Sequence, residues 1–298
     1  MKQAELHIVA GFLGSGKTTF LQKLLKTTDP ASRVAICENE YGEVGLDGLE
    51  FKSGRFELLE LNAGCICCTL GPSLVAGLKI LCARFQPDQI ILEPTGLAGL
   101  ADIREVLADA GLQKLLNVKA ALAVISGKAF EHDMPRFEKY YRDMIASASC
   151  VYLNRTEGMT PEGREQLLGF ILEHNFHAPI LEDPLDEADL WAVLNRSALP
   201  PNGEPQPRRW LSTFKEAAVP TGWAGSRERL EAFFAGNHQC GDILRVKGFV
   251  MDAAGTLWRT DYAGGALELK PAYDHAVEWL QFVGRNLAVP RLKSFFEH

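Results

Sequence analysis

Residues 11–18 combine glycines, a lysine and a threonine in the spacing of a phosphate-binding loop. They read Gly-Phe-Leu-Gly-Ser-Gly-Lys-Thr and follow an apolar stretch at residues 6–10. Glycines let successive backbone N–H groups turn towards a phosphate, and the N-terminus of the next helix adds partial positive charge. In this pattern the lysine bridges the β- and γ-phosphates and the threonine hydroxyl binds Mg²⁺. We therefore predict that Thr18 binds magnesium, and that the nucleotide is contacted by Gly14, Ser15, Gly16, Lys17, Thr18 and Thr19.

Two acidic segments follow later apolar stretches. Glu93 ends one such stretch and precedes Gly96, so the carboxylate would join the Mg²⁺ shell and the Gly96 N–H would contact the γ-phosphate. A solvated carboxylate at a strand end is the alternative. Residues 38–43 carry three carboxylates in six positions, which is typical either of a switch that contacts Mg²⁺ or a transported metal, or of a plain acidic loop. Glu40 and Glu93 are the candidates for a base beside the γ-phosphate.

Three of the seven cysteines lie within four residues, directly after Gly64. If the backbone turns there, three thiolates can converge on one soft metal ion and leave a fourth tetrahedral position open. Such a site is typical of exchangeable rather than structural zinc. A disulfide between neighbouring cysteines is strained, so the alternatives are inert cysteines or a redox pair of Cys65 and Cys67. We therefore predict a metal site at Cys65, Cys67 and Cys68.

The composition is that of an ordinary globular protein and argues against several classes of function. The chain has 298 residues, 47% of them hydrophobic, and 31 Lys and Arg against 38 Asp and Glu. An acidic balance argues against non-specific binding of nucleic acid. No apolar run reaches the roughly 18 residues of a membrane span, and the N-terminal segment lacks the pattern of a signal peptide. We therefore expect a cytoplasmic protein that binds neither nucleic acid nor membrane.

The elements that must position these residues alternate over about the first 180 positions. Stretches rich in Val, Ile and Leu predict buried strands at residues 6–10, 33–37, 57–61, 89–92, 120–125, 150–153 and 179–181. Helices are expected from Lys17, after Ser73, near Ala101, after Pro135, and from Pro161 with Thr160 as N-cap. This alternation predicts an α/β fold of the P-loop NTPase kind, with a mostly parallel sheet flanked by helices.

A smaller second domain is predicted after a proline-rich linker. Residues 199–207 hold four prolines in nine positions, which neither a helix nor a central strand accommodates. We place the first domain at 1–184, the linker with a short helix at 185–209, and the second domain at 210–298. Within the second domain we expect helices at 226–235 and 290–296 and strands at 243–251, 256–262, 266–269 and 279–283. Short alternating strands joined by glycine turns predict an α+β domain with an antiparallel sheet.

These motifs together resemble the CobW-like P-loop GTPases, relatives of UreG and HypB that are regarded as GTP-dependent metal chaperones or insertases. The resemblance covers nearly the whole chain and is carried by residues 11–19, 38–45, 64–68, 93–98 and 244–250. It implies that the three cysteines bind Zn²⁺ or a similar ion and that residues 38–43 respond to the nucleotide. It also implies that Glu38 or Glu40 completes the metal site.

The base-recognition motif departs from that family in two positions. The family carries Asn-Lys-x-Asp after the sixth strand, where this chain has Asn154-Arg155-Thr156-Glu157. The aspartate of the motif accepts two hydrogen bonds from guanine that adenine cannot donate. Arginine stacks on a base as lysine does, whereas glutamate moves the carboxylate outward by one methylene. GTP remains the predicted nucleotide, with Asn154, Arg155 and Glu157 at the base, and the preference over ATP stays open.

The leading hypothesis is a slow GTPase that uses Mg²⁺, binds a transition metal and delivers it to a client protein docked on the second domain. Zinc is the first candidate metal, with Co²⁺ and Ni²⁺ as alternatives. A first alternative function is a small-molecule phosphotransferase in which the cysteine loop is structural. A second is a metal buffer or sensor that the nucleotide merely stabilises. The sequence leaves the client, the physiological metal and the oligomeric state open.

Overall fold

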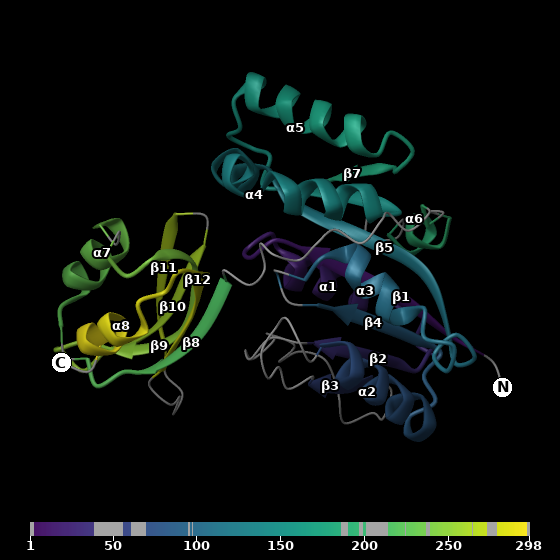
Figure 1. The fold of residues 1–298 in the computed structure, drawn as a ribbon, viewed down its shortest axis with the longest axis horizontal. Coiled ribbons are helices and arrows are strands. Elements are labelled where there is room, and N and C mark those ends of the chain that lie inside the picture. The colour runs from purple at the N-terminus through teal and green to yellow at the C-terminus, as the bar shows by residue number, and fades with distance from the viewer. Residues whose placement is uncertain are drawn as a thin grey trace. The chain divides into compact units, whose positions relative to one another are not determined.

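The computed structural model divides the chain into two compact units, Met1–Gln206 and Pro207–His298 (Figure 1). It describes residues 3–38, 56–60, 70–94, 96, 98–185, 190–196, 199–200, 214–223, 225–236, 239–263, 265–272 and 279–296. Each unit has its own sheet and its own hydrophobic core. The two units are therefore described separately.

A parallel sheet forms the centre of the first unit, with the strand order β3-β2-β4-β1-β5-β6-β7. Its strands are β1 (Ala4–Gly11), β2 (Val34–Glu38), β3 (Phe56–Glu60), β4 (Gln89–Glu93), β5 (Leu116–Ser126), β6 (Cys150–Asn154) and β7 (Ile180–Glu182). Every residue of β2 and of β6 is buried, as expected for strands covered on both faces. The predicted α/β fold is confirmed. Because all strands run the same way, the loops after them meet at one edge of the sheet.

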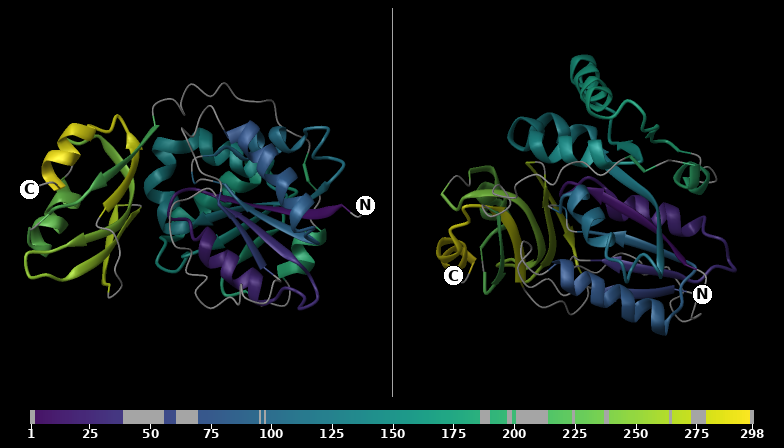
Figure 2. Two further views of the ribbon diagram at one scale, coloured as in Figure 1. Left: turned by 90° about the horizontal axis from the view of Figure 1, so that it is seen from below. Right: turned by 45° about the vertical axis from the view of Figure 1, so that its right-hand side comes forward.

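Helices cover both faces of this sheet (Figures 1 and 2). They are α1 (Lys17–Lys26), α2 (Leu70–Arg84), α3 (Leu100–Leu107), α4 (Gly127–Ser147), α5 (Pro161–His174) and α6 (Leu190–Arg196). On one face, Phe20 and Leu24 of α1 share a core cluster with Leu190 of α6 and with residues of the central strands. On the other face, the Phe12 ring packs on Tyr140 of α4, with ring centroids 5.2 Å apart. The strand β1, which leads into the phosphate-binding loop, is thus fixed from both sides.

Helix α4 begins earlier than the sequence indicated. We expected a helix after Pro135, but α4 starts at Gly127 and contains that proline. Ser126 caps the helix, since its side chain accepts a hydrogen bond from the N–H of Ala129 at 3.4 Å. Phe137 has φ −127° and ψ 23°, so the helix is kinked just after the proline. The prediction was wrong because a kink accommodates a proline that we had taken as a helix start.

The second unit holds an antiparallel sheet of order β11-β10-β9-β12-β8, as predicted for an α+β domain. Its elements are β8 (Phe214–Pro220), α7 (Arg227–Gly236), β9 (Asp242–Met251), β10 (Leu257–Ala263), β11 (Ala266–Pro271), β12 (Trp279–Arg285) and α8 (Val289–Phe296). Helices α7 and α8 share a core with the sheet, through Leu230, Phe282 and Phe296 among others. The sequence analysis missed β8. Among the described helices, none has the length and apolar character needed to cross a membrane.

Candidate functional site

The phosphate-binding loop follows β1 and depends on glycines that no other residue could replace without strain. Gly16 has φ 95°, and a Cβ atom there would lie 2.5 Å from Nδ2 of Asn154. A Cβ at Gly11 would lie 2.4 Å from Oγ of Ser15 and 2.6 Å from the carbonyl oxygen of Val124. The loop backbone therefore lies directly against β5 and the end of β6. This close packing fixes the path of the loop between strand and helix.

Lys17 lies inside this loop at the start of α1. Its side chain is buried, and Nζ donates hydrogen bonds to the carbonyl oxygens of Gly11 at 3.1 Å and Phe12 at 3.3 Å. The N-cap of α1 is Gly16, which has no side chain to accept from the N–H groups of the first turn. Thr18 is half-buried in that turn and Thr19 is exposed. The arrangement of a lysine and uncapped helix N–H groups is suited to an anion such as a phosphate.

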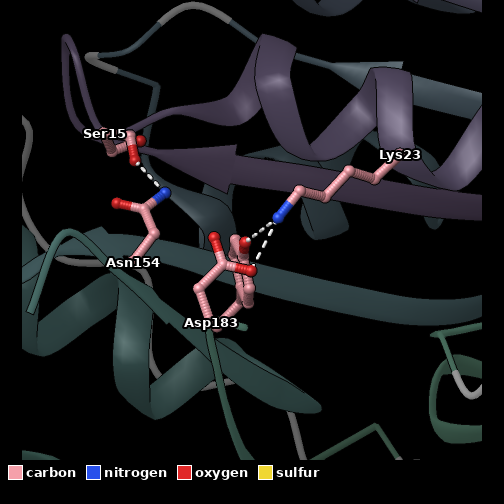
Figure 3. A network of polar contacts seen from close by, with 5 residues as sticks. Ser15, Lys23, Asn154 and Asp183 are labelled. Carbon is pink, nitrogen blue, oxygen red and sulfur yellow. Dashed lines mark hydrogen bonds and ion pairs between the residues drawn. The ribbon is translucent and has the colours of Figure 1, made fainter. Parts of the chain in front are cut away.

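The predicted base-recognition turn lies beside the loop. Asn154, at the end of β6, donates from Nδ2 to the carbonyl oxygen of Ser15 at 2.8 Å (Figure 3). Arg155 follows with φ 49° and donates from its guanidinium to the carbonyl oxygen of Gly14 at 3.2 Å. Glu157 is exposed two residues later. The structure thus brings the two predicted nucleotide motifs together, although they are about 140 positions apart in the chain.

A charged contact that the sequence analysis missed supports the same turn. Thr156 donates from Oγ1 to Oε1 of Glu182 at 2.7 Å. Both carboxylate oxygens of Glu182, at the end of β7, also accept from Arg164 of α5, at 2.5 and 2.6 Å. Hydrogen bonds from Arg164 and then from Thr156 lower the pKa of Glu182 to about 2. No local sequence pattern links these three residues, because they come from the turn after β6, from α5 and from β7.

A second ion pair connects α1 to the residue after β7. Lys23 donates to the Asp183 carboxylate at 2.6 Å and to the Tyr152 hydroxyl at 3.4 Å (Figure 3). Burial acts to raise the pKa of Asp183, but hydrogen bonds from Lys23 and Tyr152 outweigh it and the pKa is lowered. The helix that begins at the phosphate-binding loop is thereby tied to β6 and β7, which also position the base-recognition turn.

Acidic residues align at the ends of three neighbouring strands. Glu38 ends β2 and Glu93 ends β4, and their Cα atoms are partners in the parallel register. Glu60, at the end of β3, is the register partner of Glu38 on the other side. Glu38 is 5% exposed and Glu93 is 6% exposed. Adjacent strands lie roughly 5 Å apart, and buried carboxylates at the ends of such strands favour a bound cation or hydrogen bonds that offset their charge. The sequence analysis did not select Glu60, although all three strands end in glutamate.

Gly96 joins this acidic side to the phosphate-binding loop. A Cβ at Gly96 would lie 2.5 Å from Cδ2 and 3.0 Å from the backbone nitrogen of Leu13. The loop that follows Glu93 therefore runs in close contact with the loop that contains Lys17. The contact of Gly96 with a γ-phosphate stays a prediction.

The remaining predicted site residues lie outside the described residues. They are Glu40, Cys65, Cys67 and Cys68. Within the part of the chain that the structure describes, no three His, Cys, Asp or Glu side chains are grouped to hold a metal ion. Of the other cysteines, Cys37, Cys150 and Cys240 are buried and Cys82 is half-buried.

Comparisons with known proteins agree with these motifs. The model of the CobW/HypB/UreG nucleotide-binding domain matches residues 5–182. The zinc chaperone YeiR of Escherichia coli K12 is 32% identical over 161 residues, which are 54% of this chain and 49% of YeiR. The zinc chaperone CobW of a Sinorhizobium species is 29% identical over 52% of each chain. Zinc-regulated GTPase metalloprotein activator 1 of Schizosaccharomyces pombe is 30% identical over 61% of this chain and 46% of its own. The chain spans about half the length of the curated relatives it matches.

Proposed function

The chain belongs to the CobW/HypB/UreG family of nucleotide-binding domains, and from that premise we propose that it is a GTP-hydrolysing metallochaperone. It would bind zinc at the cysteine loop and deliver the ion to a client metalloprotein. The observation that carries this proposal is the assembly of the phosphate-binding loop with the base-recognition turn, through Asn154 and Arg155, in a chain of that family.

The nucleotide chemistry would come from the loop and the residues around it. Lys17 and the first turn of α1 would hold the β- and γ-phosphates, and the Gly96 N–H would contact the γ-phosphate. Thr18 and Glu93 offer a hydroxyl and a carboxylate, the oxygen ligands that Mg²⁺ prefers. Glu40 would act as the base for the attacking water, or Glu93 if Mg²⁺ is held by other ligands. We expect slow turnover by the isolated chain, with a client supplying further groups.

The metal chemistry would come from thiolates and a carboxylate. Cys65, Cys67 and Cys68 would provide three soft ligands, and Glu38 or Glu40 the fourth. The position of Glu38 supports this, since it is buried at the end of β2, beside Glu93 of the proposed magnesium site. Relatives such as YeiR and CobW are described as zinc chaperones, which favours zinc over Co²⁺ and Ni²⁺ as the cargo. Loss of the γ-phosphate would change the conformation of the segment after Glu38 and weaken the bond between the fourth ligand and the metal ion.

A metal titration in two nucleotide states tests the proposal. Co²⁺ would be added to the protein with Mg²⁺ and a non-hydrolysable GTP analogue, and separately with GDP, and the thiolate-to-metal absorbance recorded before competition with Zn²⁺. We expect tighter binding in the GTP state, and the ratio of the two affinities gives the coupling free energy directly. Equal affinities in both states would contradict a nucleotide-driven chaperone. Phosphate release, measured in parallel, tests the GTPase activity separately.

A further inference from the structure

We propose that Arg164 and Glu182 are positioning residues that set the base specificity of the nucleotide site. They would do so by fixing the turn Asn154-Arg155-Thr156-Glu157 through the hydroxyl of Thr156. We call this contact, Thr156–Glu182–Arg164, the specificity brace. The inference rests on the proposed guanine-nucleotide function and adds to it a determinant that lies outside the base-recognition motif.

The side chains of the turn alternate between the protein interior and the solvent. Asn154 is buried and Thr156 is half-buried, whereas Arg155 and Glu157 are exposed. The two inward side chains form hydrogen bonds to Ser15 and to Glu182, and the outward Arg155 also donates to the carbonyl oxygen of Gly14. The two outward ones are those predicted to stack on the base and to accept from it. The brace is therefore attached to the residue between the two proposed base contacts.

The methyl group of Thr156 lies near the first residue of α4. A Cβ at Gly127, the first residue of α4, would lie 3.2 Å from Cγ2 of Thr156. The hydroxyl is bound on the opposite side by Glu182 at 2.7 Å. A β-branched side chain is stiff about χ1, so the hydrogen bond of its hydroxyl also restricts the backbone of Thr156. Rotation of the turn would break the hydrogen bond between Thr156 and Glu182.

The charge of Glu182 makes this contact strong and directional. Arg164 binds the carboxylate through two nearly parallel hydrogen bonds of 2.5 and 2.6 Å, the geometry that lysine cannot reproduce. The hydroxyl of Thr156 then donates to an ionised carboxylate that Arg164 has already oriented. A hydrogen bond to an oriented charged group fixes position better than one to a mobile carboxylate.

The brace matters here because Glu157 stands where the family's motif has the shorter aspartate. Glutamate has one more rotatable bond than aspartate, so Glu157 can miss the two guanine donors unless its backbone is held. The Arg164 and Glu182 side chains are 42% and 31% exposed. Ion pairs with that exposure contribute little to global stability, so the main consequence of the brace is the geometry of the turn.

The test compares nucleotides that differ only in the base. Displacement of a fluorescent GDP analogue would give the affinities for GDP, inosine diphosphate and ADP. Inosine diphosphate keeps N1–H but lacks the 2-amino group, so the ratio of GDP to inosine diphosphate affinity reports a two-donor contact. The variants are Arg164→Ala, Arg164→Lys and Thr156→Val. The matched control is Arg142→Ala, which breaks an exposed ion pair with Glu138 in the same unit.

We expect Arg164→Ala to lower the ratio of GDP to inosine diphosphate affinity by about five- to tenfold. Arg164→Lys should fall between it and wild type, and Arg142→Ala should match wild type. Combining Thr156→Val with Arg164→Ala should lower the ratio no further, because both act on one brace. A ratio unchanged in Arg164→Ala, with or without a lower Tm, would overturn the proposal. A wild-type protein that binds GDP and inosine diphosphate equally would overturn the brace while leaving nucleotide binding intact. Failure to bind any of the three diphosphates would instead refute the proposed function itself.

Discussion

Two groups of residues at the edge where the parallel strands end, here called the P-loop half and the acidic half, differ in how their polar side chains are arranged. The P-loop half consists of residues 11–18, the turn 154–157 and Glu182. There, polar groups bind one another: Asn154 and Arg155 bind loop carbonyl groups, and Arg164 neutralises Glu182. The acidic half consists of Glu38 and Glu93. These two buried glutamates end neighbouring strands and are partners in the parallel register.

The difference shows what each half needs in order to work. The P-loop half is preorganised, since its backbone and its paired side chains already hold the positions that a nucleotide would contact. The acidic half brings two buried carboxyl groups to the ends of neighbouring strands, and a cation bound beside them would offset negative charge there. A cation that enters one half and a phosphate that enters the other would therefore stabilise each other. The predictions below either separate the two halves or test their contact.

The largest effect is expected from loss of the lysine of the P-loop half. Lys17→Ala should lower GTP hydrolysis by about a hundred- to a thousandfold, because it removes the buried ammonium group that would offset charge on the transferred phosphate. Phosphate release under saturating GTP measures this. Lys26→Ala, an exposed residue of the same helix, is the control. Co²⁺ binding in the absence of nucleotide should be unchanged, and a loss of it in Lys17→Ala would contradict the separation of the halves.

The complementary change is at Cys67, a predicted ligand of the cargo metal. Cys67→Ala should lower affinity for Co²⁺ and Zn²⁺ by about a hundredfold or more, since a thiolate contributes much of the binding energy of such a site. GDP affinity should stay at the wild-type value. The matched control is Cys82→Ala, because Cys82 is half-buried on α2 and burial raises the pKa of its thiol. Wild-type metal affinity in Cys67→Ala would show that the site assignment is wrong.

The sequence predicted the scaffold better than the site because different forces determine them. Strands buried on both faces must be continuous apolar runs, so β2 and β6 are plain in the sequence. Two elements were misjudged for local reasons. Helix α4 contains a proline at a kink, and β8 follows a proline-rich stretch and carries Ala217-Ala218 in place of a clear alternation. In both cases tertiary packing overrides the local signal.

The phosphate-binding loop and the turn 154–157 were predicted because glycines and charged residues occupy fixed positions within a few residues of one another. The specificity brace was not predicted from the sequence, because Thr156, Arg164 and Glu182 come together only when β6, α5 and β7 fold. The alignment of Glu38 with Glu93 likewise depends on strand order, which places β2 beside β4 rather than beside β1. A sequence names candidate residues, whereas their pairing follows from topology.

An intermediate effect, on stability, is expected at His7 of β1, the strand between the two halves. His7 is fully buried against Trp191 of α6. Burial lowers its pKa from 6.5 to about 4, while Glu5 raises it and Lys119 lowers it by smaller amounts. Between these values the unfolded chain binds a proton that the folded chain does not, so stability falls as the pH falls. The loss is about 1.4 kcal/mol per pH unit, or about 2 kcal/mol near pH 5.

Replacing the imidazole should remove this dependence. The free energy of unfolding of both proteins, measured with urea, is compared at about pH 7.5 and about pH 5. We expect the loss on lowering the pH to be about 2 kcal/mol smaller in His7→Leu than in wild type. Burial and then Asp102 raise the pKa of Asp143 to about 6. Titration of Asp143 changes the unfolding free energy equally in both proteins, so its effect cancels in the comparison. Parallel pH profiles for the two proteins would show that His7 does not carry the effect.

The smallest effect, and the one that addresses the contact of the two halves, is expected at Gly96. A Cβ there would press on Leu13 of the P-loop half, at 2.5 Å from Cδ2 and 3.0 Å from the backbone nitrogen. The leucine side chain can rotate, but the backbone must shift by a few tenths of an ångström.

We expect Gly96→Ala to lower GTP turnover by about tenfold with little change in GDP affinity, since the γ-phosphate contact is displaced and the diphosphate contacts are not. Gly169→Ala is the control, because a Cβ at Gly169 on α5 meets nothing within 4 Å. Equal losses of turnover and GDP affinity in Gly96→Ala would show that the substitution distorts the whole loop. In that case Gly96 would support the P-loop half and would not transmit the state of the nucleotide to the acidic half.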